Sequence, residues 1–355
     1  MSKSPAFGLI LAGGGGTRLW PASRRKRPKQ LLALGGSESL IAATFGRVSR
    51  FLGKERTLIV TAADQAEEIR RALPELPAEN LVAEPAARNT GPAVGLGAVA
   101  AARRAGDDVR LAVIPSDAFI ADEPEYGRVL TRALEQATET IVTVGIKPTR
   151  PETGYGYLQR GALVRDGVYD VARFVEKPEA ATAGKYLAAG DFLWNSGMFF
   201  FTARRLFAET ARHLPELATI LAELRASADF AAVAAARYPS SPKISIDYGI
   251  MEKAGGIRVV PGDFGWNDVG SWSALADIRE QDGAGNVALG DVVLSAVSGS
   301  VVVAEPGAPL VGVVGVDDLV VVATRDAVLV VPKARAQEVR AVVDALAAAG
   351  RNELL

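Results

Sequence analysis

The sequence predicts an α/β fold with a mixed, mostly parallel sheet, followed by a small C-terminal domain rich in β-structure. The first half of the chain alternates short apolar runs with helix-forming stretches, an order typical of parallel strands whose connecting helices cover both faces of a sheet. Residues 286–332 are instead dense in valine, with glycine and aspartate at intervals, which indicates many short strands. We therefore expect two domains, residues 1–280 and residues 281–355.

The individual elements follow from the same alternation. Buried strands are expected at residues 7–12, 57–61, 81–83, 111–114 and 140–144. Helices are expected at residues 63–73, 91–105, 126–138, 230–237 and 333–349. Ligands in parallel sheets bind beyond the carboxyl ends of the strands. The glycines after the first strand and the pair Ser116-Asp117 after the fourth are therefore expected to belong to one site.

Composition excludes several kinds of chemistry. The 355 residues contain no cysteine and one histidine, His213, which excludes disulfides, thiolate nucleophiles and multi-histidine metal sites. A bound metal must then have oxygen ligands, which favours Mg²⁺ or Mn²⁺. The 40 basic and 41 acidic residues nearly cancel, so we expect neither nucleic acid nor a membrane as partner. Residues 1–7 do not form a signal peptide and no apolar run could span a bilayer, so we expect a cytoplasmic protein.

The strongest local feature is the glycine-rich loop Leu11-Ala12-Gly13-Gly14-Gly15-Gly16-Thr17-Arg18. Glycines let the backbone approach a ligand and turn successive N–H groups towards phosphate oxygens. The loop does not end in the Gly-Lys-Ser/Thr of a P-loop, and it lacks the third glycine of the dinucleotide fingerprint. For a glycine run alone, a flexible turn after the strand is the alternative interpretation.

A cluster of basic side chains weakens that alternative. It comprises Arg18, Arg24, Arg25, Lys26, Arg27 and Lys29. Arginine binds phosphate through a planar fork of donors and lysine through a point charge. Next to the glycines, Arg18 and Lys29 are expected to bind phosphate, whereas residues 25–27 are also explained as solvated surface. The sequence thus predicts a local phosphate site.

Several motifs in order along the chain resemble the sugar-1-phosphate nucleotidyltransferase family. They are residues 11–21, Ser23-Arg24, Pro28-Lys29-Gln30, Glu84-Pro85, Arg88-Asn89-Thr90, Pro115-Ser116-Asp117 and residues 174–178, 194–198 and 266–272. The Leu-Trp-Pro and Pro-Lys-Gln forms are similar to the mannose-1-phosphate guanylyltransferase branch. The resemblance covers most of the chain and is specific when the motifs are taken together. It implies a Rossmann-like, GT-A-like catalytic domain and a C-terminal domain similar to a small left-handed β-helix, through which homodimers often form.

The resemblance also implies roles for particular residues. Arg18, Lys29 and Lys177 are implied to be catalytic, and Asp117 and Asp268 to hold Mg²⁺, with Mn²⁺ as the alternative. Two carboxylates with phosphate oxygens and water suit the octahedral shell of magnesium. In isolation, Asp117 is better explained as a helix cap or a turn aspartate. Asp268, between two tryptophans, is equally well explained as part of a structural turn. Ala118 stands where similar sequences often have histidine, so any role of that histidine is in doubt here.

The remaining implied roles concern the two substrates. The nucleotide is implied to contact Leu11, Ala12, Gly13, Gly14, Gly16, Thr17, Glu84, Arg88, Asn89 and Thr90, although Thr90 is also explained as a cap of the helix at residues 91–105. The sugar is implied to contact Tyr157, Glu176 and Asn195. A carboxylate accepts from paired hydroxyls and an ammonium neutralises phosphate, which agrees with Glu176 and Lys177. A salt bridge at a strand end is the alternative for that pair, and a core position is the alternative for Tyr157.

The expected activity is transfer of GMP from GTP to α-D-mannose 1-phosphate, giving GDP-mannose and pyrophosphate by magnesium-assisted direct displacement at the α-phosphorus. The attacking phosphate is already anionic, so the reaction needs no strong general base, which fits a chain with one histidine and no cysteine. The rivals are another nucleoside triphosphate, another sugar such as mannoheptose 1-phosphate, and a catalytically silent subunit. The isomerase activity of bifunctional members is expected to be absent, because residues 281–355 lack histidine.

Overall fold

The computed structural model describes residues 5–14, 16–34, 36–138 and 140–355, which form two compact units. Unit 1 comprises Met1–Gly13, Phe45–Ser116 and Asp122–Phe264. Unit 2 comprises Gly14–Thr44, Asp117–Ala121 and Gly265–Leu355. Unit 2 therefore gathers three segments that lie far apart in the sequence. The domain boundary expected near residue 280 stays a prediction.

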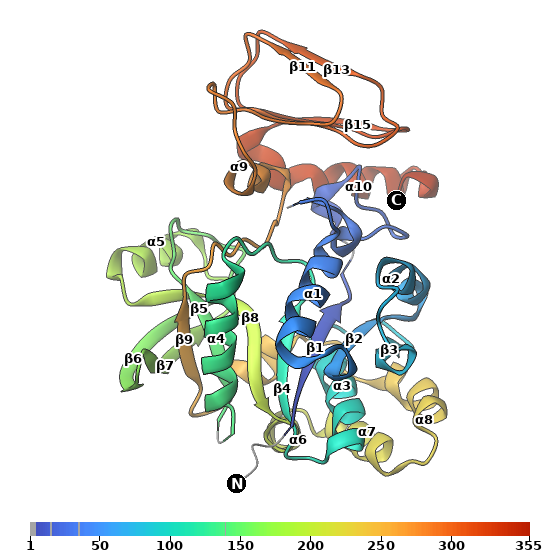
Figure 1. The fold of residues 1–355 in the computed structure, drawn as a ribbon, viewed down its shortest axis with the longest axis vertical. Helices are drawn as coiled ribbons and strands as arrows, with labels where there is room; N and C mark the ends of the chain where they lie inside the picture. The colour runs from blue at the N-terminus through green and yellow to red at the C-terminus, as the bar shows by residue number, and fades with distance from the viewer. Residues whose placement is uncertain (1–4, 15, 35, 139) are drawn as a thin grey trace. The chain divides into compact units, whose positions relative to one another are not determined.

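A mixed sheet of nine strands forms the centre of unit 1 within the described residues, in the order β3-β2-β1-β4-β8-β5-β9-β7-β6 (Figure 1). The parallel part consists of β1 (Ala6–Ala12), β2 (Thr57–Ala62), β3 (Leu81–Glu84) and β4 (Arg110–Pro115). The rest consists of β5 (Val142–Ile146), β6 (Tyr157–Arg165), β7 (Val168–Val175), β8 (Phe192–Thr202) and β9 (Arg258–Gly262). In that part only β5 and β9 pair in parallel. The predicted α/β class with a mixed sheet is confirmed.

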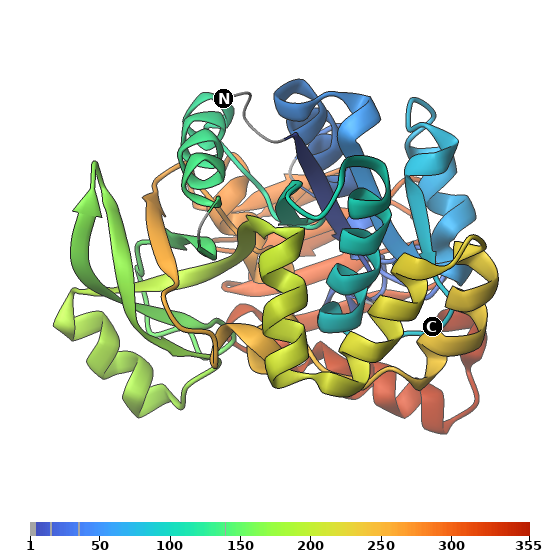
Figure 2. The same ribbon diagram turned by 90° about the horizontal axis from the view of Figure 1, so that it is seen from below.

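Helices cover both faces of this sheet. Gly8 and Leu9 are adjacent in β1 and so face opposite sides. Val48 of α1 (Leu40–Leu52) lies against Gly8, and Gly97 of α3 (Thr90–Ala105) lies against Leu9. The other helices are α2 (Ala66–Ala72), α4 (Glu123–Gln136), α5 (Ala180–Ala189), α6 (Ala203–His213), α7 (Pro215–Ala226) and α8 (Phe230–Arg237). Figure 2 shows α6 and α7 beside α3, with which they share one apolar core.

The C-terminal part of unit 2 is a coil of short strands (Figure 1). One sheet contains β10 (Val287–Leu289), β12 (Val301–Ala304), β14 (Leu319–Ala323) and β15 (Val328–Pro332), and another pairs β11 (Val292–Ser295) with β13 (Val311–Val314). Val287, Val301 and Val320 lie in register and are buried. The predicted β-rich domain is confirmed. The homodimer expected through it stays a prediction.

The closing helix expected at residues 333–349 consists of two elements in the structure. Residues Lys333–Val339 form a 3-10 helix, and Arg340–Ala348 continue as α10, shown in red in Figure 1. A short helix, α9 (Leu275–Ile278), precedes the strands of this part. No helix within the described ranges is long and apolar enough to cross a membrane.

Two tryptophans of the sequence motifs belong to the apolar core of unit 2. Trp20 donates from its indole N–H to the carbonyl oxygen of Leu354 at 2.9 Å, and Trp272 donates to the carbonyl oxygen of Trp20 at 2.9 Å. Both rings pack in the core that includes Leu19 and Val301. These aromatic residues therefore support the fold of unit 2.

Packing at Gly97 gives a test of the core of unit 1. A Cβ atom there would lie 2.3 Å from Leu9 Cδ1, so Gly97→Ala is expected to lower the free energy of unfolding by about 1–3 kcal/mol through overpacking. Gly127 in α4 has no neighbour within 4 Å of such an atom, and Gly127→Ala should be neutral or stabilising by about 0.4–1 kcal/mol. Urea unfolding of both variants measures the difference, and equal effects would contradict this account of the packing.

Candidate functional site

Lys29 links the three segments of unit 2. Its side chain is 10% exposed, and its ammonium donates to Asp117 Oδ2 at 2.7 Å and to the carbonyl oxygen of Asp268. Lys29 belongs to the first segment of the unit, Asp117 to the second and Asp268 to the third. A buried ammonium requires acceptors that replace water. The network therefore holds the two predicted metal ligands and a predicted catalytic lysine in one place.

The glycine-rich loop packs closely on this lysine. Gly16 has φ of 56°, and a Cβ atom there would lie 2.4 Å from Lys29 Cβ. Ser23 fixes the loop by donating from its hydroxyl to the carbonyl oxygen of Gly16 at 2.6 Å. Only glycine satisfies both the positive φ and the close approach. Gly15 of the predicted loop lies outside the described residues.

Three other basic residues of the cluster have partners within unit 2. Arg18 is exposed and donates to Gln337 Oε1 at 2.8 Å. Arg24 pairs with Asp326 at 2.8 Å and Arg27 with Glu305 at 2.7 Å. A pocket of about 480 Å³ is lined by Pro21, Ala22, Arg24, Arg27, Glu305, Pro306, Thr324, Arg325 and Asp326. Arg27 is therefore an ion-pair partner as well as a surface residue.

Asp268 lies in a tight turn that directs its carboxylate. Its Oδ1 accepts from the backbone N–H of Gly270 at 3.2 Å, and a Cβ atom on Gly270 would lie 2.8 Å from Oδ2. Val269 between them is buried and has φ of 47°, which is an uncommon conformation for a β-branched residue. Uncommon backbone conformations of this kind cluster at functional sites, and here one accompanies a carboxylate that is held in place.

The donors at this place suit magnesium. Among the described residues, no group of three or more acidic, histidine or cysteine side chains could hold a metal by itself. Asp117 and Asp268 supply carboxylate oxygens, and Mg²⁺ commonly takes one or two protein carboxylates and completes its shell with phosphate oxygens and water. The residues therefore fit a magnesium ion that binds together with a triphosphate.

Glu84 in unit 1 lies beside the start of the glycine loop. A Cβ atom on Gly13 would lie 3.4 Å from Glu84 Oε1, while Glu84 Oε2 accepts a hydrogen bond from the hydroxyl of Tyr238. Burial raises the pKa of Glu84 above its ordinary value. Sequence reasoning missed Tyr238, which is 154 residues away from Glu84 and lies in no recognisable motif.

The next motif along the chain, Arg88-Asn89-Thr90, has structural partners as well. Arg88 donates to the carbonyl oxygen of Pro239. Asn89, with φ of 68°, caps α3 by accepting from the backbone N–H of Thr90 at 2.8 Å. The Thr90 hydroxyl instead accepts from the backbone N–H of Ile246 at 3.0 Å. The alternative that Thr90 caps this helix is therefore wrong, because Thr90 is already its first helical residue.

A second group of predicted residues meets in unit 1. A Cβ atom on Gly156 would lie 2.4 Å from Glu176 Oε2 and 3.2 Å from Asn195 Cβ. The Lys177 ammonium lies 3.2 Å from Glu176 Oε1 and is half exposed. Tyr157 is buried, and its hydroxyl donates to the carbonyl oxygen of Glu152 at 2.9 Å. Glu176, Lys177 and Asn195 thus form one polar cluster, and Tyr157 contributes to the core beneath it.

Two acidic residues that the sequence interpretation missed complete this cluster. Asp247 Oδ1 accepts from Asn195 Nδ2 at 3.0 Å, and Glu252 Oε1 accepts from the backbone N–H of Glu176 at 3.0 Å. Asp247 is the first residue of a π-helical turn, Asp247–Met251, and Glu252 follows the last residue of that turn. The sequence signal that could have indicated them is one acidic residue at each end of the run Tyr-Gly-Ile-Met. Burial, with a smaller contribution from Asp247, raises the pKa of Glu176 to about 7.

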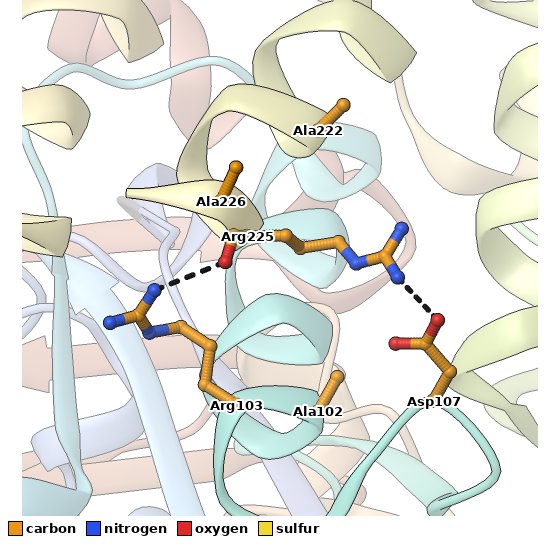
Figure 3. Close-up of a pocket in the computed structure, with 6 residues that line it drawn as sticks. All are labelled: Ala102, Arg103, Asp107, Ala222, Arg225 and Ala226. Carbon is orange, nitrogen blue, oxygen red and sulfur yellow. Dashed lines mark hydrogen bonds and ion pairs between the residues drawn. The ribbon is translucent and has the colours of Figure 1, made fainter. Parts of the chain in front are cut away.

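Unit 1 also has a pocket, and none of the predicted site residues lines it. It has a volume of about 410 Å³ and is lined by Ala102, Arg103, Asp107, Ala222, Arg225 and Ala226 (Figure 3). Arg103 donates to backbone carbonyls at the end of α7, including that of Ser227 at 2.6 Å, and Arg225 pairs with Asp107. The arginines of this pocket therefore stabilise the α3–α7 contact.

Comparison with known proteins identifies the family. Residues 7–284 match the model described as nucleotidyl transferase, and residues 290–346 match the one described as a MannoseP isomerase/GMP-like beta-helix domain. The chain belongs to the nucleotidyl transferase family. This confirms the recognition based on the ordered motifs.

Individual relatives of this nucleotidyltransferase match over nearly its whole length. Xanthan biosynthesis protein XanB of Xanthomonas campestris pv. campestris is 43% identical over 99% of the chain and 75% of the relative. Mannose-1-phosphate guanylyltransferase of Escherichia coli K12 is 40% identical over 99% of the chain and 76% of the relative. A crystal structure from Thermus thermophilus, described as a mannose-1-phosphate geranyltransferase, has a TM-score of 0.88 at 41% identity, covering 96% of this chain and 99% of that one.

The raised pKa of Glu176 predicts a pH-dependent stability. Between its ordinary value of 4.5 and about 7, the unfolded chain has lost the Glu176 proton and the folded chain retains it, so stability falls as pH rises. The free energy of unfolding of the wild type relative to Glu176→Gln should fall by about 3 kcal/mol between pH 4.5 and pH 7.5. Urea unfolding across this range measures the change, with Glu216→Gln on an exposed helix face as control. A constant difference would show that Glu176 titrates normally.

Proposed function

We propose that this nucleotidyltransferase transfers GMP from GTP to α-D-mannose 1-phosphate, giving GDP-mannose and pyrophosphate. The observation that carries the transfer chemistry is the network in which Lys29 binds Asp117 and the backbone of Asp268. It combines a cation for phosphate with two carboxylates for a metal. The choice of guanine and mannose is supported by the Escherichia coli relative named above, which matches over almost the whole chain.

The proposed step is a direct displacement. A phosphate oxygen of mannose 1-phosphate attacks the α-phosphorus of GTP, and the bond from that phosphorus to the bridging oxygen of the β-phosphate breaks. Pyrophosphate leaves with the electron pair, so no protein nucleophile is needed. The chain has no cysteine, and His213 lies at the end of α6 with its Nε2 3.2 Å from Glu209. Catalysis therefore depends on positioning and charge neutralisation.

Residues of unit 2 are assigned to the triphosphate. Lys29 and Arg18 would neutralise the phosphates and the departing pyrophosphate. Arg18 has a neutral amide partner in Gln337, so it can turn to a phosphate without breaking an ion pair through that contact. Asp117 and Asp268 would hold Mg²⁺, which when bound supplies further positive charge at the phosphates. Backbone groups of Gly14, Gly16 and Thr17 are assigned to the same phosphates, together with that of Gly13, the last residue of the first segment of unit 1.

Residues of unit 1 are assigned to the base and the sugar. Glu84 can accept from the N1–H and N2 amino groups of guanine, because Tyr238 occupies only one of its oxygens among the described contacts. Lys177 is assigned to the sugar phosphate, and Glu176 and Asn195 to sugar hydroxyls. A cytoplasmic location is part of the proposal, since nucleoside triphosphates are made there.

A substrate screen tests the assignment. Pyrophosphate release is measured with each common nucleoside triphosphate against mannose, glucose and mannoheptose 1-phosphates. The proposal predicts that GTP with mannose 1-phosphate gives the highest kcat/KM. Preference for another pair would replace the substrates and keep the reaction class, and no release with any pair would contradict the reaction itself.

The metal assignment predicts a specific loss of activity. Asp268→Asn keeps the shape of the side chain and removes its charge, so magnesium-dependent turnover should fall by roughly a hundred- to thousand-fold or more. Circular dichroism and thermal unfolding check that the variant is folded. Asp263→Asn, on an exposed residue in unit 1, is the matched control and should keep wild-type activity. Near-normal turnover of Asp268→Asn would remove Asp268 from the metal site.

A further inference from the structure

The π-helical turn Asp247–Met251 brings unassigned acidic residues to the polar cluster of unit 1. Asp247 begins the turn and accepts from Asn195, and Glu252 follows it and accepts from the backbone of Glu176. π-Helical turns are rare and are frequently found at functional sites. The turn and the residue that follows it therefore contact the two polar residues to which the sugar is assigned.

The contacts of Asn195 fix the orientation of its amide. Its Oδ1 accepts from the backbone N–H of Gly197 at 3.2 Å and lies 3.3 Å from the Thr143 hydroxyl. Its Nδ2 donates to Asp247 at 3.0 Å. An ionised carboxylate accepts hydrogen bonds and cannot donate them. Asp247 therefore holds the nitrogen of the Asn195 amide towards its own oxygens. Within the described residues, Asn195 keeps one amide proton that has no protein partner.

This orientation makes the cluster complementary to a hydroxyl group. Asn195 offers a donor, while Glu176, whose Oε2 faces Gly156 beside Asn195, offers an acceptor. A sugar hydroxyl both donates and accepts, so it can bind the two groups at once or through a neighbouring hydroxyl. If the amide were reversed, it would present its oxygen, and the cluster would offer two acceptors and no donor from Asn195.

We propose that Asp247 is a positioning residue for sugar 1-phosphate binding, which orients the Asn195 amide so that its free N–H meets a sugar hydroxyl. The inference rests on the proposed function and adds to it the residue that sets the polarity of the hydroxyl contact. Asp247 does not itself touch the sugar. Its effect should therefore appear in the binding of the sugar phosphate and leave the binding of the nucleoside triphosphate unchanged.

Two substitutions at Asp247 separate positioning from a merely structural role. Asp247→Ala removes the acceptor, and in the full-length chain it should raise KM for mannose 1-phosphate about tenfold, which corresponds to about 1.4 kcal/mol. KM for GTP should change by less than about twofold. Asp247→Asn retains an acceptor oxygen and should restore most of the affinity. Tyr248→Ala, at an exposed position of the same turn, is the control and should leave both KM values unchanged.

The outcomes distinguish this inference from the proposed function. If another pair of substrates is preferred in the screen, the same KM comparison is made with that pair. Calorimetric titration with mannose 1-phosphate and with glucose 1-phosphate tests binding without turnover, and Asp247→Ala should weaken whichever binding the wild type shows. An unchanged KM for the sugar phosphate, an equal rise in both KM values, or a wild type that binds neither sugar phosphate would overturn the inference.

Discussion

The buried ammonium of Lys29 is the interaction on which the candidate transfer site depends. Leaving such a charge without partners would cost several kcal/mol, so its acceptors must fold around it. Those acceptors come from Asp117 and Asp268, which are 88 and 239 residues away in the sequence. The fold of unit 2 therefore brings these charged groups together. This explains why motifs scattered along the chain are informative only when taken together.

The polar cluster of unit 1 is built on a different principle. Glu176, Asp247 and Glu252 place three acidic side chains close to one ammonium, that of Lys177. Burial and mutual repulsion then raise the pKa values of Glu176 and Asp247. Such a cluster is rich in acceptors, which suits the many hydroxyl donors of a sugar. The cations and carboxylates of unit 2 suit phosphates and a metal instead.

Sequence patterns predicted the parts of this molecule that depend on local order. The apolar runs predicted the parallel strands β1–β4, because a buried strand needs a continuous apolar stretch. The glycine run predicted a close backbone approach, and Gly16 against Lys29 is such a contact. The antiparallel pairing of β6, β7 and β8 was not predicted, since it depends on long-range register.

The parts that could not be predicted depend on tertiary partners. Tyr238 forms a hydrogen bond with Glu84, and Asp247 forms one with Asn195. The partners in each pair are far apart in the sequence, and no spacing rule connects them. Asn89 caps α3 and has a positive φ, and the sequence does not reveal this beside an equally suitable Thr90. The nucleobase and the sugar were inferred from resemblance alone, because glycines, arginines and carboxylates bind any triphosphate in much the same way.

The fate of the α-phosphorus tests the central claim most directly. GTP carrying radioactive phosphorus at the α-position, and in a parallel reaction at the γ-position, is incubated with the enzyme, mannose 1-phosphate and magnesium, and the products are separated by chromatography. Direct displacement predicts that the α-label enters a sugar nucleotide and the γ-label enters pyrophosphate. An α-label that stays on the protein, or a γ-label that appears as orthophosphate, would contradict the account.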